Sequence, residues 1–279
     1  HIRKGNYDAV ISFLETPNFL NNFSAIGGKS WKVITGERSA KESSFTSIRG
    51  KILAWFQRYS DSIVCNSNNA KEMWKKYYPQ YKNKLTTIYN TVSLPEITSD
   101  YIPRKEGKTH IIIAASYQYL KNPIGLIKAL ALLNNEEREK IRVDWFGKYK
   151  FDGSAYKECL ELINNNQLNE VIFLNDQSKD VINKMNEADI VGLFSSVEGL
   201  PNTICEGMML GKPIIMTKVS DYNVLVEENN GFLCDWDNIK KIKYTLSLII
   251  NLSNKEIKEM GMQSKFKADY IFSEKLIIN

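Results

Sequence analysis

The sequence is poor in the residues that build disulfide frameworks and metal sites. Its 279 residues include 4 Cys and 2 His, and the cysteines lie far apart at positions 65, 159, 205 and 234. No spacing typical of a zinc site or a secreted disulfide scaffold occurs, so we expect no bound metal and four reduced thiols in the cores of a cytoplasmic protein. No run of 18 apolar residues and no secretory signal is recognised, so we expect no membrane-spanning helix.

Charge is distributed unevenly along a chain of otherwise ordinary composition. Hydrophobic residues make up 43% and charged residues 25%, as in a typical globular protein. Residues 1–108 hold 17 Lys and Arg against 9 Asp and Glu, whereas the remainder holds 20 against 23. The basic first part suits an anionic partner, although solvated surface is the commoner explanation. No nucleic-acid-binding motif is recognised, so we expect no nucleic acid partner.

Short apolar runs alternate with helical patterns along the whole chain. This alternation predicts parallel sheets covered by helices, that is, a doubly wound α/β fold. The expected strands lie at residues 9–14, 32–35, 62–66, 85–89, 110–115, 141–146, 171–174, 189–194, 213–216 and 231–233. The expected helices lie at residues 48–59, 69–78, 123–133, 155–165, 181–186, 202–210 and 239–252.

The alternation is interrupted once, at residues 91–108, where two prolines and little apolar pattern predict a linker. We therefore expect two α/β domains, at residues 1–103 and 104–279. The chain begins with His1 in the middle of a pattern, so we expect the first domain to lack its N-terminal part.

The stretch SSVEGLPNTICE, residues 195–206, leads from an expected strand into an expected helix. Pro201 suits the first turn of that helix because its missing N–H costs nothing there. The first free N–H groups of the helix then form an anion site of phosphate size at the carboxyl end of the strand. Gly199 lets the backbone approach a ligand closely.

Two carboxylates flank this anion site, Glu198 in the loop and Glu206 inside the helix. Carboxylates repel phosphate, but they accept hydrogen bonds well from the vicinal hydroxyls of a sugar or a ribose. Phosphates on the helix start with hydroxylated rings on either side describe a nucleotide-sugar. Either residue taken alone is better explained as an ordinary charge, Glu206 on the helix surface and Glu198 at the helix start. Their combination with Gly-Leu-Pro-Asn at a strand-to-helix turn favours the functional interpretation.

This stretch resembles the Glu-x7-Glu signature of retaining glycosyltransferases of the group 1 family. Glu198 and Glu206 have the signature's spacing, with Gly-Leu-Pro between them and Gly-Lys-Pro leading into the next strand. Weaker resemblances follow in the family's order at residues 66–67, 88–90 and 227–233. The resemblance implies the GT-B fold, in which two Rossmann-like domains face each other across a cleft.

The resemblance also implies roles for particular residues. Glu206 would hold the ribose hydroxyls, and Glu198 would contact the donor sugar near its reacting carbon. Other positions would surround the donor: the distal phosphate would lie at Gly199, Leu200, Pro201 and Asn202, the nucleobase at Phe173 and Leu174, and another part of the donor at Gly147.

One position departs from the family pattern. The family has Arg-x4-Lys after the first strand of its second domain, where two cations neutralise the diphosphate. Lys121 matches the lysine and would stabilise the leaving group, but Ser116 stands in place of the arginine and brings no charge. Arg38 is a candidate to compensate and Glu37 to bind a sugar hydroxyl, although a local pair between these two neighbours is an equal alternative.

The function implied is transfer of a hexosyl group from a UDP- or GDP-sugar to a glycan or lipid-linked acceptor in polysaccharide biosynthesis, with no cofactor and no metal. A nucleotide-sugar epimerase or phosphorylase, or a non-catalytic nucleotide-sugar-binding subunit, are the alternatives. Residues 48–59 and 71–78 interleave cations with aromatics and suit helices that rest on the inner face of a membrane. Ordinary helices with apolar faces in the core would show the same composition.

Overall fold

The computed structural model describes residues 2–38, 41–98, 100–103 and 107–272. Contacts divide the chain into two compact units. The first comprises His1–Asn90 with Val197–Leu200, and the second comprises Thr91–Ser196 with Pro201–Asn279. The boundary expected between residues 103 and 104 borders residues 104–106, which lie outside the described residues.

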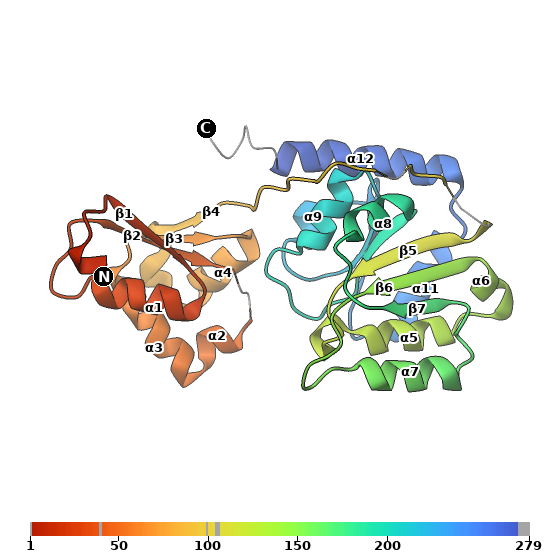
Figure 1. Cartoon of the computed structure of the whole chain (residues 1–279), viewed down its shortest axis with the longest axis horizontal. Helices are drawn as coiled ribbons and strands as arrows, with labels where there is room; N and C mark the ends of the chain where they lie inside the picture. Colours follow the sequence, from red (N-terminus) through yellow and green to blue (C-terminus); the bar gives the residue numbers. More distant parts are fainter. Residues whose placement is uncertain (1, 39–40, 99, 104–106, 273–279) are drawn as a thin grey trace. The chain divides into compact units, whose positions relative to one another are not determined.

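The first unit is built on a parallel sheet of four strands in the order β1-β2-β3-β4 (Figure 1). The strands are β1 (Ala9–Phe13), β2 (Lys32–Glu37), β3 (Ser62–Cys65) and β4 (Leu85–Thr87). All of their pairings are parallel, as the apolar runs predict.

Helices connect these strands and pack on the sheet. The connections are η1 (Ile2–Lys4), α1 (Glu15–Ser24), α2 (Ser43–Thr46), α3 (Ile48–Phe56), η2 (Gln57–Tyr59), α4 (Asn68–Tyr77) and η3 (Pro79–Lys84). Ser67 begins α4 by accepting a hydrogen bond from the Ala70 N–H at 3.1 Å, and Pro79 follows its end. The core beneath α3 and α4 contains Ile63 and Cys65, whereas Ile11 on β1 is 59% exposed.

The second unit has a parallel sheet of six strands in the order β10-β9-β8-β5-β6-β7. The strands are β5 (Thr109–Ala114), β6 (Ile141–Phe146), β7 (Ile172–Asn175), β8 (Ile190–Leu193), β9 (Ile214–Thr217) and β10 (Gly231–Cys234). The chain proceeds outward from β5 to β7, then returns to the other side of β5 and continues to β10. The order therefore reverses between β5 and β8, which is where ligands bind in open α/β sheets.

Helices cover both faces of this second sheet. They are η5 (Tyr119–Lys121), α5 (Pro123–Ala131), α6 (Asn135–Glu139), α7 (Tyr156–Asn165), α8 (Val181–Glu187), α9 (Asn202–Met209), α10 (Tyr222–Leu225), α11 (Ile239–Ile249) and α12 (Asn254–Phe272). Figure 1 shows α5, α7 and α11 on one face, and α8, α9 and α12 on the other.

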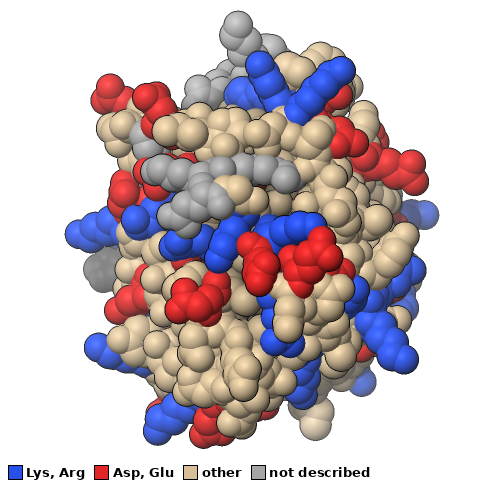
Figure 2. Space-filling view, turned by 90° about the vertical axis from the view of Figure 1, so that its right-hand side faces the viewer, with Lys and Arg blue, Asp and Glu red and all other residues tan. Residues whose placement is uncertain are grey.

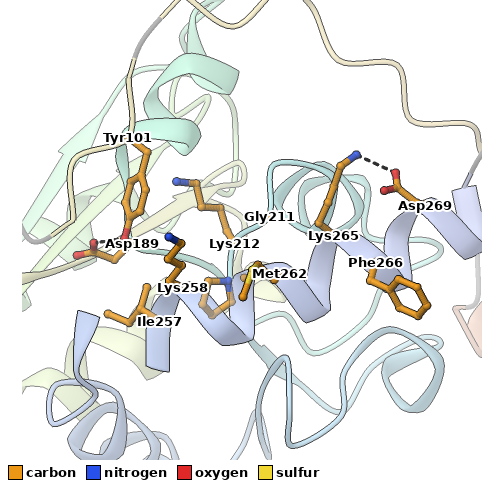
Figure 3. Close-up of a pocket in the computed structure, with 12 residues that line it drawn as sticks. Tyr101, Asp189, Gly211, Lys212, Ile257, Lys258, Met262, Lys265, Phe266 and Asp269 are labelled. Carbon is orange, nitrogen blue, oxygen red and sulfur yellow. Dashed lines mark hydrogen bonds and ion pairs between the residues drawn. The ribbon is translucent and has the colours of Figure 1, made fainter. Parts of the chain in front are cut away.

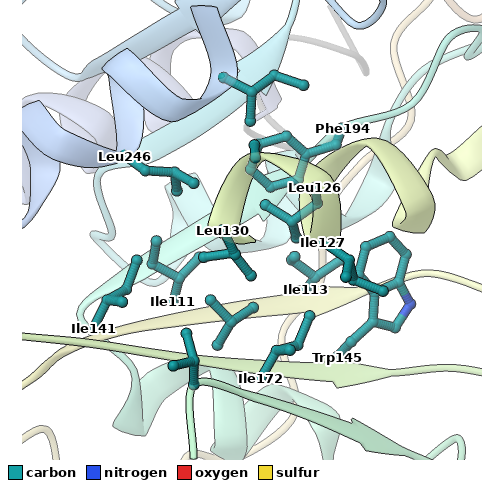
Figure 4. Packing of buried hydrophobic residues seen from close by; sticks show 14 of the residues in the cluster. Ile111, Ile113, Leu126, Ile127, Leu130, Ile141, Trp145, Ile172, Phe194 and Leu246 are labelled. Atoms are coloured by element: carbon teal, nitrogen blue, oxygen red, sulfur yellow. The ribbon is translucent and has the colours of Figure 1, made fainter. Parts of the chain in front are cut away.

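Alternating side chains of the central strands build the core of the second unit (Figure 4). Ile111 and Ile113 of β5 and Trp145 of β6 point to the same face, where they meet Leu126 and Leu130 of α5. All five side chains are at most 1% exposed. The short apolar runs are thus strands buried on both faces of a sheet.

The expected strands are all present, with ends within two residues of the predicted ones. Helices α1, α2, α6, α10 and α12 were not predicted, because their apolar spacing is weak or short. The four cysteines are free and buried, as expected. Among the described residues, no helix is both long and apolar enough to cross a bilayer.

Candidate functional site

Two loops meet at the switch point between β5 and β8. The backbone N–H of Ser196, after β8, donates to the Leu120 carbonyl in η5 at 2.8 Å, and its hydroxyl donates to the same oxygen at 3.2 Å. The Thr203 hydroxyl, in the first turn of α9, donates to the Ala114 carbonyl at the end of β5 at 2.9 Å. The loop after β5 and the start of α9, both predicted to hold phosphates, are therefore neighbours.

Helix α9 begins as the sequence predicts. The helix starts at Asn202, as expected, but Pro201 occupies the N-cap position rather than the first turn, and its side chain makes no capping hydrogen bond. Asn202 and Glu206 lie four residues apart and so share one face of the helix. Glu206 is half-buried, and burial raises the pKa of its carboxyl group. The positive end of the helix dipole and a desolvated carboxylate thus lie one turn apart.

The segment from β5 to α5 contains Ser116 and Lys121 and is anchored at its far end. Lys121 ends η5, and Asn122 follows in the left-handed conformation with φ of 60°. The Asn122 side chain caps α5 by accepting from the Gly125 N–H at 3.1 Å and donates to the Trp236 carbonyl at 2.8 Å. These bonds hold Lys121 at the carboxyl edge of the sheet, while Ser116 lies between β5 and η5.

Gly147, after β6, approaches this segment so closely that no side chain fits. A Cβ placed on it would lie 1.9 Å from the Ala115 carbonyl oxygen and 3.1 Å from the Ser116 Cα. The Ala115 oxygen is held in place because it accepts a hydrogen bond from the Trp145 indole at 2.6 Å. A glycine is therefore required at position 147 so that the loop after β6 can pack closely against the segment that contains Ser116.

Phe173 and Leu174 are adjacent on β7, so their side chains point to opposite faces of the sheet. Leu174 packs against the main core. The ring of Phe173 lies on the other face. The central carbon of the Arg142 guanidinium lies over this ring, 4.6 Å from the ring centroid. The two side chains do not line one common surface, and the placement of a nucleobase near either stays a prediction.

The remaining predicted residues belong to the first unit by their contacts. Glu198, Gly199 and Leu200 lie in the loop that connects β8 to α9. Glu37 ends β2, and its carboxylate accepts from the Arg38 N–H at 3.0 Å. The Arg38 guanidinium lies over the Phe13 ring, 4.9 Å from its centroid. The roles of these residues stay predictions.

Sequence reasoning missed three residues that hold the site together: Ser196, Thr203 and Tyr117. Their hydroxyls bond backbone carbonyls of strands and of η5 that are distant in the sequence, and a sequence carries no signal for such partners. Within the described ranges, no three His, Cys, Asp or Glu side chains gather closely enough to hold a metal ion.

We expect Tyr117→Phe to destabilise the second unit by about 1 kcal/mol, because two backbone carbonyls would lose a buried hydroxyl donor, and the Asn175 carbonyl keeps the Gly147 N–H. The Tyr117 hydroxyl lies 2.9 Å from the carbonyl oxygens of both Trp145 and Asn175, and the side chain is fully buried. Urea unfolding measures the loss. Tyr156→Phe is the matched control, since its ring lies 5.0 Å away between centroids and makes neither bond. Equal losses in both variants would contradict the role of the Tyr117 hydroxyl.

A cavity of about 460 Å³ lies away from this edge, beside α12 and the amino end of β9 (Figure 3). Lys212 lines it; its ammonium lies 3.5 Å from the centroid of the Tyr101 ring, and burial lowers its pKa to about 8. The Tyr101 hydroxyl donates to Asp189 at 2.9 Å. These contacts anchor Tyr101, near the start of the second unit, to the rest of that unit. None of the predicted site residues line the cavity.

The fold is that of a protein with two α/β units, and in the second unit the loop after β5 meets the start of α9. Comparison with known families identifies its family. The model of the family described as glycosyl transferases group 1 matches residues 96–265. The match covers more than half of the chain, so the protein belongs to this family. The two parallel-sheet units confirm the expected fold class.

Particular relatives agree with this assignment. An uncharacterized glycosyltransferase of Haemophilus influenzae is 27% identical over 220 residues, covering 78% of this chain and 59% of the relative. A second, from Methanocaldococcus jannaschii, is 26% identical over 227 residues, covering 78% and 58%. This chain therefore spans less than two thirds of their length. The crystal structure of Anabaena HepE in complex with UDP superposes with a TM-score of 0.82 at 16% identity, covering 97% of this chain and 76% of HepE.

Proposed function

We propose that the protein is a retaining glycosyltransferase that moves a hexosyl group from a UDP- or GDP-sugar to a glycan or lipid-linked acceptor in polysaccharide biosynthesis. The observation that carries the proposal is the junction of the Lys121 segment with the start of α9 at the switch point of the second sheet. The family assignment supports it. The similar fold of HepE, solved with UDP and with UDP-glucose, favours a UDP-sugar donor. The four free thiols agree with a cytoplasmic location.

In this proposal the second unit binds the donor. The amides at the start of α9 and the Lys121 ammonium face the diphosphate, and the Glu206 carboxylate accepts hydrogen bonds from the ribose hydroxyls. Glu198 contacts the donor sugar near its anomeric carbon. Lys121 and the helix dipole stabilise the charge that develops on the departing nucleoside diphosphate, which is the main electrostatic requirement of the reaction.

In the chemical step that we propose, attack on the front face of the sugar retains the configuration of the anomeric carbon. The acceptor oxygen attacks the anomeric carbon on the face from which the nucleoside diphosphate leaves. As the bond between that carbon and the phosphate oxygen breaks, the acceptor hydroxyl passes its proton to the leaving phosphate. The products are the glycosylated acceptor and a nucleoside diphosphate, and no covalent enzyme intermediate forms.

Ser116 favours a second candidate function, because the diphosphate has one cation fewer than the family pattern provides. A subunit that binds a nucleotide-sugar without transferring it would tolerate this loss. If Arg38 supplies the missing charge, transfer proceeds. The alternative of an epimerase predicts a changed sugar with no release of nucleoside diphosphate.

We expect UDP or GDP, and their sugars, to raise the melting temperature of the chain in a thermal-shift panel that includes ADP-sugars. A ligand at one hundred times its dissociation constant stabilises by about 2.7 kcal/mol. Lys121→Ala should remove most of the shift, since it deletes the diphosphate's cation. Lys128→Ala is the control that should leave the shift intact, because Lys128 is an exposed lysine on α5, seven residues after Lys121.

Analysis of the products then distinguishes an active enzyme from a non-catalytic subunit. Release of nucleoside diphosphate from a stabilising donor, by hydrolysis or transfer, supports the transferase. Tight binding with neither product supports the subunit, and a changed nucleotide-sugar supports the epimerase. No shift with any nucleotide would refute a donor site in the second unit.

A further inference from the structure

Helix α3 of the first unit exposes an apolar stripe. Ile48, Ile52 and Trp55 are 81%, 53% and 46% exposed, although they are large hydrophobic side chains. They are spaced at i, i+4 and i+7, so at 3.6 residues per turn they lie within an arc of about 60°. The opposite side of α3, with Gly50 and Ala54, is buried. The helix thus has two apolar faces, and only the inner one packs in the core.

Cations and aromatic rings flank one side of this stripe. Lys51 and Arg58 are exposed, and the Arg58 guanidinium lies over the Trp55 ring, 3.9 Å from its centroid. Lys51, Trp55 and Arg58 also line a groove of about 460 Å³ with Tyr78 and Lys84. A hollow of about 310 Å³ on the stripe itself shares Lys51 and Trp55 with the groove, so the two surfaces are continuous.

The distribution of charge between the two units indicates the charge of the partner that this surface binds. Residues 1–90 hold 14 Lys and Arg against 6 Asp and Glu, a balance of +8, whereas residues 91–279 hold 23 against 26. Figure 2 shows a face of the molecule where basic and acidic side chains are interspersed. The excess of positive charge therefore belongs to the unit that also carries the apolar stripe, and it is complementary to an anionic surface.

The neighbouring helix α4 has a similar composition but does not expose its tryptophan as α3 does. Residues 71–78 also mix cations with aromatics, but Trp74 is only 4% exposed and packs edge-on against Phe45 in the core. The expectation of a membrane-facing helix is therefore kept for α3, while the Trp74 side of α4 serves the core.

We propose that α3 docks the first unit onto an anionic phospholipid bilayer. Ile48, Ile52 and Trp55 enter the interface between headgroups and acyl chains, where an indole ring is favoured. Lys51 and Arg58 pair with lipid phosphates, and the groove beside Trp55 accommodates a headgroup. This surface is separate from the donor site, so its test does not depend on nucleotide binding.

The experiment is co-sedimentation of the chain with phospholipid vesicles of two compositions. One is phosphatidylcholine alone, and the other contains about 30% phosphatidylglycerol in phosphatidylcholine. We expect binding to the anionic vesicles only, and weaker binding at high salt. Ile48→Ser combined with Ile52→Ser should lower the partition coefficient at least tenfold, because apolar insertion is lost. Lys51→Glu combined with Arg58→Glu should lower it similarly by reversing two charges.

Met262→Ser combined with Phe266→Ser on α12 is the matched control, since both residues are exposed, at 55% and 76%. It should bind vesicles like the unchanged chain. All four substituted residues are exposed: Ile48, Lys51 and Ile52 of α3 and Arg58 of η2. Unchanged thermal unfolding is therefore expected in each variant. No vesicle binding, or equal losses with the α12 control, would overturn the proposal. So would a concentration-dependent dimer that the Ile48 and Ile52 substitutions convert to monomers, because a second copy would then cover the stripe.

Discussion

Gly147→Ala is expected to destabilise the second unit by about 3 kcal/mol and to abolish stabilisation by UDP or GDP. The new Cβ would lie 1.9 Å from the Ala115 carbonyl oxygen, which no contact in a folded protein tolerates. That oxygen cannot move freely, because it accepts the Trp145 indole N–H. Relief of the clash must therefore displace the backbone at Ser116 and break or stretch the indole hydrogen bond.

Displacement of this segment connects stability to binding. Ala115 also donates its N–H to the Phe146 carbonyl at 3.0 Å, so the ends of β5 and β6 separate together. Ser116 and the downstream Lys121 would then leave the positions proposed for the diphosphate. Chemical denaturation measures the first effect, and titration with nucleotide below the new melting temperature measures the second.

Gly153→Ala in the same loop is the control for Gly147→Ala. Gly153 has a φ of 75° and nothing within 4 Å of an added Cβ, so its substitution should cost only the backbone strain of about 1–2 kcal/mol. It should also leave nucleotide binding unchanged. If both variants behave alike, the close approach of Gly147 to Ala115 does not position the segment that contains Ser116.

Glu206→Gln is expected to raise the stability of the ligand-free protein at pH 7 and to weaken donor binding about thirtyfold. The binding loss reflects a charged hydrogen-bond acceptor replaced by a neutral one, worth about 2 kcal/mol. The gain in stability has the opposite origin. Burial raises the pKa of the Glu206 carboxyl group, so the folded state disfavours the carboxylate that the unfolded chain carries freely.

The sign of the pH dependence follows from this shift. The folded protein holds the Glu206 proton more tightly than the unfolded chain, so this residue's contribution to stability falls as pH rises from the unfolded pKa through the raised folded one. Above the raised folded pKa, the full loss of stability caused by the buried Glu206 carboxylate persists. The advantage of the Gln variant should therefore be present at pH 7 and disappear below the ordinary pKa of 4.5.

Thermal unfolding at the two pH values, with and without UDP, measures both effects of Glu206→Gln. Glu161→Gln on the exposed face of α7 is the control and should change neither stability nor binding. Unchanged nucleotide affinity in Glu206→Gln would remove this residue from the ribose site. Lower stability at pH 7 would show instead that the carboxylate has a stabilising partner in the folded protein.

The sequence by itself determined the strands, their parallel pairing and the position of the α9 start. These features depend on local signals: apolar runs long enough for a buried strand, and Gly-Leu-Pro before a helix. It also determined family membership, because Glu198 and Glu206 keep a specific spacing along the chain. The hydroxyl bonds of Ser196, Thr203 and Tyr117 were decided only by the tertiary structure, since each joins residues 28 to 89 positions apart.

The same distinction between local pattern and packing applies to the membrane-facing helix and to Gly147. Composition alone made α3 and α4 equal candidates for a membrane-facing helix, because both mix cations with aromatics. Packing decided between them: Trp74 of α4 turns inward to Phe45, whereas Trp55 of α3 stays exposed beside Arg58. The need for glycine at position 147 was likewise invisible in the chain, because the atom it must avoid lies on another strand's loop. Local pattern specifies which elements form, and only their packing specifies which side chains meet.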